Sequence, residues 1–410
     1  MTHRPRISRP TRTPPTSAIT RLARRPRPAT AAAAALLLAG VAGAAACSAQ
    51  PWTTTSAQTP AGGSAAQRHA FTLVASGDVL PHASIIRQAN ADADGDGYDF
   101  APMLAGAKPV VSKADLAICH METVYGADGD YSGYPAFKSP PQVARALKAT
   151  GYDSCSTASN HTLDDGADGI RRTLDALDKA GVKHAGSART AAEDKSPAWL
   201  RAGDAKVAQL AYTYGTNGYP LPKDKPWSVD LIDRAKIVAD ARAARKAGAD
   251  VVVVSLHWGT EWQDEPDRQQ LSLGKQLTAS RTDGRPDIDL LLGTHAHVPQ
   301  AYEKVNGTWV IYGMGDQIAG AMINHEDEPD PRGNQGTIGR FTFEPPAKDG
   351  ERWQVKKAEF LPMLFDTDSN RVVNLNRALD RGAEVSDVRD RIRRVVLSRG
   401  AGKDGLVMGK

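Results

Sequence analysis

The sequence predicts an α/β protein in which largely buried β-strands alternate with helices. Short apolar runs rich in Val, Ile and Leu are separated by segments with helical periodicity, and Gly, Asn and Asp punctuate the runs. Hydrophobic residues make up 41% of the 410 residues and charged residues 24%, which suits a globular protein with a substantial core. This length fits one large domain with additions, or two domains.

The first 47 residues are predicted to be a targeting segment that lies outside the fold. An arginine-rich start precedes the apolar stretch 31–46, which is shorter than the ~20 residues of a membrane span. Cys47 directly follows three alanines, as at a bacterial lipoprotein cleavage site. We therefore expect export and lipidation at Cys47, which would anchor the protein to the outer face of the cell membrane. An uncleaved single-span anchor is the alternative.

Residues 48–69 are predicted to be a flexible tether, because Ser, Thr, Ala, Gly, Gln and Pro cannot bury enough apolar surface to order it. Eight of the 51 lysines and arginines precede residue 28, so the rest of the chain has 43 basic residues against 47 acidic ones. A mildly acidic body lacks the clustered basic surface that nucleic acids require. We therefore expect no nucleic-acid partner.

The predicted elements follow in a regular order. Apolar runs predict strands at 71–76, 115–119, 152–157, 206–212, 251–256, 288–292 and 309–312. Apolar residues at spacings of three and four predict helices at 141–149, 169–180, 232–247 and 269–280. The pattern changes after residue 339, where strands are predicted at 340–344 and 356–360 and a closing helix at 386–398.

Two cysteines lie near the ends of predicted strands. In an oxidising compartment Cys119 and Cys155 could form a disulfide if their strands are neighbours. Two buried free thiols are an equally acceptable interpretation. The sequence leaves both open.

Histidines follow the predicted strands more often than chance placement would explain. Six of the ten histidines lie just past a strand end, and ligands of open α/β sheets bind at the carboxyl ends of strands. These six are His82, His120, His161, His257, His295 and His297.

The motif Gly293-Thr-His295-Ala-His297 is the most specific of these. Its two histidines can face one site if the backbone turns there, and Gly293 permits such a turn. Neutral imidazole is the commonest side-chain metal ligand. The alternative is one exposed histidine and one that caps a helix.

A second motif joins a ligand to a general acid. The side-chain carbonyl of Asn160 is a candidate metal ligand, and the adjacent His161 is a candidate general acid. Asp164 or Asp165 could orient the imidazole from its far side. Alternatively, these Asn and Asp residues only cap the helix that follows.

Carboxylates follow three of the strands. Asp78 and Glu122 are hard oxygen ligands that could bridge two cations, and Glu261 accompanies His257 after the most apolar strand. A buried salt bridge would explain any one of these pairs.

Asp92, Asp94 and Asp96 resemble the start of a calcium loop. Met103 stands where the bidentate Glu of such a loop belongs, so we expect a polar loop.

Taken together, these motifs resemble the CapA-type family of poly-γ-glutamate capsule synthesis proteins, which is similar in fold to the calcineurin-like metallophosphatases. The resemblance runs from about residue 71 to about residue 318 and includes Tyr98-Asp-Phe and Phe137-Lys-Ser-Pro. It implies a β sandwich flanked by helices, with the site at the carboxyl ends of the strands. The domain is then expected over 70–366, followed by a C-terminal helical extension at 367–410.

The resemblance also implies roles for individual residues and one or two divalent cations, with Mn, Zn or Fe as candidates. His161 would be the catalytic acid. Beside what the resemblance implies, Asp164 is the candidate to orient His161, and His120 and Glu261 are candidates to contact substrate, with an added metal ligand as the alternative for His120. His120-Met121 stand where the family has Asn-Leu, and Glu122 stands in place of a bridging Asp, so the number and identity of the metals stay open. The implied metal ligands are Asp78, His82, Glu122, Asn160, His257, His295 and His297.

Two functions from different classes follow from this reading. The first is a metal-dependent hydrolase of phosphoester or acyl substrates in capsule biosynthesis. The second is a membrane-anchored protein that binds an anionic polymer, or assists its transport, without catalysis. A purely structural polar network is the third interpretation, and it requires that all these ionisable groups satisfy one another.

Overall fold

The computed structural model describes residues 68–348 and 351–410. The predicted targeting segment, its lipidation candidate Cys47 and nearly all of the predicted tether lie outside these residues. Within the described part, no helix combines the length and apolar character needed to cross a membrane.

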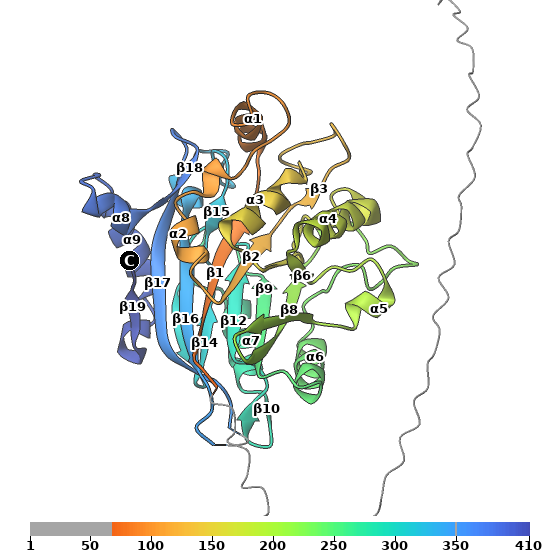
Figure 1. The fold of residues 1–410 in the computed structure, drawn as a ribbon, viewed down its shortest axis with the longest axis vertical. Coiled ribbons are helices and arrows are strands. Elements are labelled where there is room, and N and C mark those ends of the chain that lie inside the picture. Colours follow the sequence, from red (N-terminus) through yellow and green to blue (C-terminus); the bar gives the residue numbers. More distant parts are fainter. Residues whose placement is uncertain (1–67, 349–350) are drawn as a thin grey trace, which may run out of the picture. The chain divides into compact units, whose positions relative to one another are not determined.

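The first sheet contains nine strands in the order β18-β17-β16-β1-β2-β5-β6, with β15 beside β1 and β19 beside β17 (Figure 1). β1, β2, β5, β6 and β15 run parallel to one another, so their carboxyl ends share one edge, whereas β16 pairs with β1 in the antiparallel direction. The bounds are β1 Phe71–Val79, β2 Leu116–Met121, β5 Ser154–Ser156, β6 Lys183–Ala185, β15 Asp316–Ile318, β16 Gln335–Glu344, β17 Gln354–Asp366, β18 Arg371–Asn374 and β19 Leu406–Met408.

The second sheet contains six strands in the order β13-β14-β12-β9-β8-β7. Its four central strands are parallel, and β7 and β13 are antiparallel edges. The bounds are β7 Ala198–Ala202, β8 Ala205–Thr213, β9 Val251–His257, β12 Leu290–Thr294, β13 Tyr302–Val305 and β14 Thr308–Ile311. Two short ribbons pair β3 Val124–Tyr125 with β4 Lys138–Ser139, and β10 Arg281–Thr282 with β11 Arg285–Pro286.

Alternating side chains place the two sheets face to face. Along β1, Leu73 and Ala75 enter the core between the sheets, whereas Val74 packs with the helices outside. Most helices cover the outer faces of the sheets, which gives a helix–sheet–sheet–helix sandwich, but the two C-terminal helices pack against the core between the sheets. The helices are α1 Ala83–Ala91, α2 Lys108–Val111, α3 Gln142–Thr150, α4 Gly166–Ala180, α5 Ala191–Asp194, α6 Arg234–Lys246, α7 Arg268–Thr278, α8 Leu375–Asp380 and α9 Ser386–Val396, with short 3-10 turns at Pro102–Leu104, Pro331–Asn334 and Ala401–Asp404.

The predicted α/β sandwich is confirmed, and every strand and helix predicted from the sequence is present, although β16 begins five residues earlier and β17 ends six residues later than predicted. The segment 367–410 differs from the expectation of a helical extension. It contains α8 and α9, but it also adds β18 and β19 to the first sheet. Leu375, Ile392 and Val396 are fully buried in the core between the sheets, so this segment completes the domain.

The structure resolves the alternative that the sequence left open for the two cysteines, and it shows the contacts of the loop after α1. Cys119 and Cys155 lie opposite each other on β2 and β5, with their Cα atoms 4.4 Å apart, and form a disulfide. The loop after α1 is the expected polar loop, because Asp92 accepts hydrogen bonds from Gln88 and Arg371 rather than facing a set of carboxylates.

Candidate metal centre

The candidate site lies where the carboxyl ends of parallel strands from both sheets meet. β1 supplies Asp78 and β2 supplies His120, with Glu122 one residue beyond it. From the second sheet, His257 ends β9, and His295 and His297 follow β12. Strand ends therefore bring together residues that are more than 200 positions apart in the chain.

Two sets of side chains converge closely enough to hold a cation. One is Asp78, His120 and His257, and the other is Asp78, Glu122 and His297, each with ligand atoms within 4.8 Å of one another. Asp78 belongs to both sets, so it could contribute a ligand to either one. His120 was expected to contact substrate, but its ring faces Asp78 and stacks on His257 at 4.7 Å, so the structure groups it with the candidate ligands.

Several polar atoms of this cluster are fully buried and lack hydrogen-bond partners among the described residues. Burying such atoms without a partner is costly, because each gives up its hydrogen bonds to water. A divalent cation accepts lone pairs from carboxylate oxygens and imidazole nitrogens, so this donor set fits one or two such ions. The atoms are Asp78 Oδ1, His120 Nε2, both carboxylate oxygens of Glu122, His295 Nδ1 and Asp316 Oδ2.

The turn after β12 is strained at the histidines themselves. His295 has φ 93° and His297 has φ 58°, a region that non-glycine residues seldom adopt. The backbone N–H of His295 donates to Asp78 Oδ2 at 3.0 Å, which ties the turn to β1. Gly293 was predicted to permit this turn, but its role is to allow a close approach of the backbone. A Cβ at Gly293 would lie 2.0 Å from the carbonyl oxygen of Tyr312.

Neighbouring side chains fix the imidazole rings. His120 Nδ1 is hydrogen-bonded to Ser156 Oγ at 2.7 Å, and His257 Nδ1 to Thr294 Oγ1 at 3.0 Å. On its other side, His257 Nε2 lies 2.8 Å from Asn160 Oδ1, which places the predicted amide ligand at the same centre. Such hydrogen bonds select the tautomer and orientation of ligand histidines.

Asp316 completes the cluster and was missed in the sequence. It opens β15, lies beside Asp78 in the parallel pairing, and its Oδ1 is 3.0 Å from His297 Nδ1. The available signal was Gly315-Asp316 after an apolar strand, which repeats Gly77-Asp78 after the first strand.

Burial dominates the electrostatics of the site. It raises the pKa of Asp78 and of Glu122 well above ordinary carboxyl values, and it raises the pKa of Asp316 to about 6. Burial lowers the pKa of His120 to about 3. Burial also opposes charge on His297, but Asp316, Glu122 and Asp78 outweigh it and raise the pKa of that imidazole.

The predicted acid pair lies beside the cluster without belonging to either set of converging ligands. His161 Nδ1 is 2.7 Å from Asp164 Oδ2, which also accepts the backbone N–H of Phe137. Asp165, the other candidate partner, instead pairs with Arg172 and makes no side-chain cap at α4. Asp164 is therefore the residue that orients the imidazole.

Asn217 connects the acid pair to the metal cluster and had no counterpart in the sequence analysis. Its Oδ1 accepts a hydrogen bond from Asn160 Nδ2 at 3.2 Å, and its Nδ2 lies 3.4 Å from His161 Nδ1. Its φ of 49° holds this side chain in a left-handed turn after β8. Asn217 therefore aims the carbonyl oxygen of Asn160 toward His257.

Two predicted residues lie at the margin of the site. His82 Nδ1 accepts the backbone N–H of Gly320 at 3.1 Å, so the structure places this ring before α1 and outside both ligand sets. Glu261 is partly exposed, with one oxygen 3.9 Å from His295 Nε2 and the other 3.4 Å from His325 Nε2. This position suits the predicted contact with substrate.

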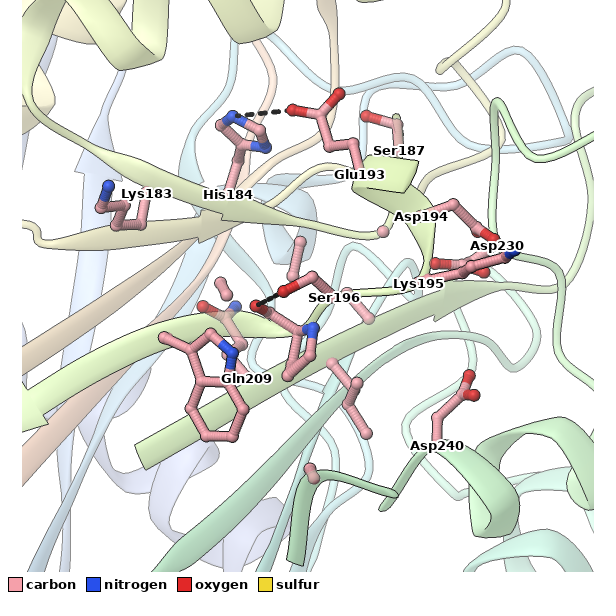
Figure 2. A pocket seen from close by; sticks show the side chains of 18 of the residues that line it. Lys183, His184, Ser187, Glu193, Asp194, Lys195, Ser196, Gln209, Asp230 and Asp240 are labelled. Atoms are coloured by element: carbon pink, nitrogen blue, oxygen red, sulfur yellow. Dashed lines mark hydrogen bonds and ion pairs between the residues drawn. The ribbon is translucent and has the colours of Figure 1, made fainter. Parts of the chain in front are cut away.

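A separate cavity of about 620 Å³ lies among β6, β7, β8, α5 and α6, and none of the predicted site residues lines it. Figure 2 shows His184 and Glu193 facing each other on one wall. Arg189 pairs with Glu193, Asp175 and Asp178, which balances much of the charge there. This network joins α4 to α5 and stabilises the edge of the sandwich.

Comparisons with known proteins agree with the sequence motifs. The family described as Bacterial capsule synthesis protein PGA_cap matches residues 72–321. Capsule biosynthesis protein CapA of Bacillus anthracis is 26% identical over 180 residues, which cover 43% of this chain and 42% of that protein. A probable polyglutamine synthesis accessory protein of Mycobacterium tuberculosis is 27% identical over 216 residues, covering 50% and 55%. The chain thus spans about half the length of these curated relatives.

Solved structures with related arrangements include phosphoesterases. A putative 5′-nucleotidase of Staphylococcus aureus, in complex with alpha-ketoglutarate, has a TM-score of 0.43 and 16% identity over 79% of this chain and 58% of that chain. A calcineurin-like phosphoesterase of Bacillus subtilis has a TM-score of 0.41 and 15% identity over 80% and 98%. The site described above rests on the residues of this chain alone.

Proposed function

This chain belongs to the bacterial capsule synthesis protein family, and we propose that it is a divalent-cation-dependent hydrolase that acts in capsule polymer biosynthesis on the outer face of the cell membrane. The proposed location rests on the arginine-rich start, the short apolar stretch and Cys47 of the sequence. The proposed role in capsule biosynthesis rests on family membership and on relatives named for capsule or polyglutamine synthesis.

One observation carries the hydrolase proposal. Unpartnered carboxylate and imidazole atoms converge at the strand ends, and a histidine–aspartate pair lies beside them but outside both ligand sets. A site that only binds a polymer needs the first feature and has no use for the second. The His161–Asp164 pair therefore favours chemistry over binding alone.

The residues of the chain suit hydrolysis in a specific way. Bound cations would supply Lewis acidity and activate water at neutral pH. Asp164 accepts a hydrogen bond from His161 Nδ1, which orients the imidazole and leaves Nε2 to face a leaving oxygen or nitrogen as a general acid. Asp78, Glu122 and Asp316 would supply negative charge that holds the cations in place.

The experiment that tests this proposal measures metal content and hydrolysis on the same preparations. The protein is purified without chelator, beside Glu122→Gln and His161→Ala variants and Asp92→Asn as an acidic control that belongs to neither ligand set. We expect bound transition metal in the wild-type, D92N and H161A proteins and its loss in E122Q. Hydrolysis of phosphodiester or γ-glutamyl test substrates should be lost in both E122Q and H161A.

Two outcomes would contradict the proposal in different ways. Failure of the wild-type protein to bind Mn²⁺ or Zn²⁺ would remove the metal site. Stoichiometric metal without any turnover, combined with metal-dependent retention of an anionic polymer, would favour the non-catalytic binding function instead.

A further inference from the structure

We propose that the cavity at the edge of the sandwich is a second ligand site, separate from the metal centre, and that it binds an ammonium group followed by amides. The amino-terminal end of a peptide and a small amino amide both have this chemistry. The cavity of about 620 Å³ has the volume of a small-ligand site. It lies between β6, an edge strand of the first sheet, and β7, an edge strand of the second.

A buried amide side chain lines the cavity without a partner. Gln209 lies on β8 and is completely buried. Neither its Oε1 nor its Nε2 has a hydrogen-bond partner among the described residues. Such an amide lowers the stability of the fold unless something in the cavity supplies both a donor and an acceptor. Another amide group does so, because it offers one of each.

The backbone of β8 adds a second unpaired amide close to Gln209. On the side of β8 that faces β7, strand pairing stops at Gln209 and Ala198. Backbone bonding on this side resumes only where Thr213 bonds to the segment 230–232. Ala211 lies between these points and lines the cavity, so its N–H and C=O groups face the gap, where the described chain gives them no backbone partner. An extended peptide could fill this gap as an added strand does.

Carboxyl groups collect at the other end of the cavity. Figure 2 shows Asp194 and Asp230 together, on the far side of the cavity from Gln209. Burial and the neighbouring carboxyl of Asp194 raise the pKa of Asp230 to about 7, although Lys236 opposes this shift. Lys236 is shared between Asp230 and Asp240, at 3.0 and 2.7 Å. One ammonium thus serves two of the three carboxyls, and a ligand ammonium would add the missing positive charge.

The remaining walls favour a slender ligand without negative charge. Lys183 and Lys195 line the cavity but are exposed, and Arg189 is already paired with Glu193. No buried cation of the described lining is therefore left for an anion. Alanine side chains make up much of the wall and leave room for a chain of amides. These are Ala185, Ala198, Ala211, Ala243, Ala244 and Ala247.

The spacing along β8 sets the length of the ligand. Gln209 and Thr213 lie four positions apart, which corresponds to about 13 Å in a strand. The backbone N–H of Thr213 donates to the carbonyl oxygen of Asp230 at 2.9 Å, so the carboxyl end of the cavity lies at the level of Thr213. A chain of about three extended residues therefore reaches from the carboxyls past Ala211 to Gln209.

The test is calorimetry of the purified protein with three probes. Trialanine amide carries the ammonium and the amides, N-acetyl-trialanine amide lacks the ammonium, and hexylamine lacks the amides. The variants are Gln209→Leu and Asp194→Asn. Asp168→Asn is the control, because Asp168 is exposed and does not line the cavity. Metal content and the denaturant midpoint are measured in each protein.

We expect wild type and D168N to bind trialanine amide. Q209L should bind it roughly 5- to 150-fold more weakly, which corresponds to two lost hydrogen bonds. D194N should bind it roughly 10-fold more weakly, with no change for the N-acetyl probe. Hexylamine should bind Q209L as it binds wild type. Q209L should unfold at the same or a higher denaturant concentration, because it removes an amide without partners, and metal content should not change.

Alaninamide distinguishes the two sources of this ammonium–amide chemistry. Affinity equal to that of trialanine amide indicates a small amino amide, and weaker binding indicates the end of a peptide.

Wild-type protein that binds none of the probes, or Q209L that binds trialanine amide as tightly as wild type does, would overturn the inference. Loss of stability in Q209L at unchanged affinity would overturn it as well, by showing that Gln209 supports the fold through bound water. If Q209L does not fold, equal weakening of the free and acetylated probes in D194N is the result that overturns the inference. Hydrolysis at the metal centre is not altered by any of these results, so the two proposals stand or fall separately.

Discussion

Replacing Glu122 by glutamine should change stability in opposite directions depending on whether a cation is present. Glu122 is buried, and neither of its oxygens has a hydrogen-bond partner within the described part of the chain. Burial raises its pKa, so the folded protein without metal binds a proton that the unfolded chain releases near neutral pH. The stability contributed by this carboxyl therefore falls as pH rises above the unfolded pKa of about 4.3.

The magnitude follows from these two states. At pH 7.5 with EDTA, E122Q removes the penalty of a buried charge but keeps an amide that needs partners, so we expect the free energy of unfolding to rise by roughly 1–2 kcal/mol. With Mn²⁺ at 100 times its Kd, wild type gains about 2.7 kcal/mol. A 100-fold weaker Kd in E122Q leaves it a gain of only about 0.4 kcal/mol at the same concentration. The order of stability should therefore reverse.

The assay is denaturant unfolding of wild type, E122Q and the control D92N, each with EDTA and with Mn²⁺. D92N should respond to Mn²⁺ as wild type does, because Asp92 pairs with Arg371 and belongs to neither ligand set. An E122Q protein that is less stable than wild type by the same amount in both conditions would show that Glu122 supports the fold directly. That result would refute its assignment to a cation.

Four further predictions concern the site and its surroundings. His161→Ala should retain metal and lose roughly 10²- to 10⁴-fold in kcat; loss of metal in that variant would place His161 among the ligands. Cation affinity should rise between pH 5 and 8, and binding should release protons. The reason is that burial raises the pKa of Asp316 to about 6 and that cation binding must displace protons from the carboxyls. Calorimetry in buffers of different ionisation enthalpy measures the number of protons released, and a value of zero would contradict the prediction. Asn217→Ala should lower kcat by about 10-fold at unchanged metal content, since the Asn217 side chain orients Asn160 and contacts His161. Activity equal to that of the wild type would show that Asn217 does not position these residues. Arg189→Ala should lower the unfolding free energy by roughly 1–2 kcal/mol, because Asp178 and Glu193 lose the guanidinium with which they pair. Mn²⁺ binding by the folded protein is the control and should not change.

The sequence was sufficient to place most of the candidate site. Apolar runs and helical spacings are local patterns, so they identified each strand and helix, although β16 begins five residues earlier and β17 ends six residues later than predicted. Because parallel strands end at one edge of a sheet, ligand-type residues after those runs could be assigned to one site before their neighbours were known. Asp78, Glu122, His257 and His297 were identified in this way and converge in the structure.

Other features depended on which strands became neighbours. Asp316 faces Asp78 only because β15 pairs with β1, across 238 positions of the chain. The disulfide exists because β2 and β5 are adjacent, and the last 44 residues complete the core because β18 and β19 pair with β17. Asn217 reaches the site because the turn after β8 adopts a left-handed backbone conformation.

The division has a physical cause. Residue type and local periodicity determine which segments form strands and which atoms can bind a cation, and both are written in the sequence itself. The meeting of those atoms depends on long-range pairing and on single backbone angles, such as the positive φ of His295 and His297. The sequence therefore determined what kind of site this protein has, and the tertiary structure decided which residues complete it.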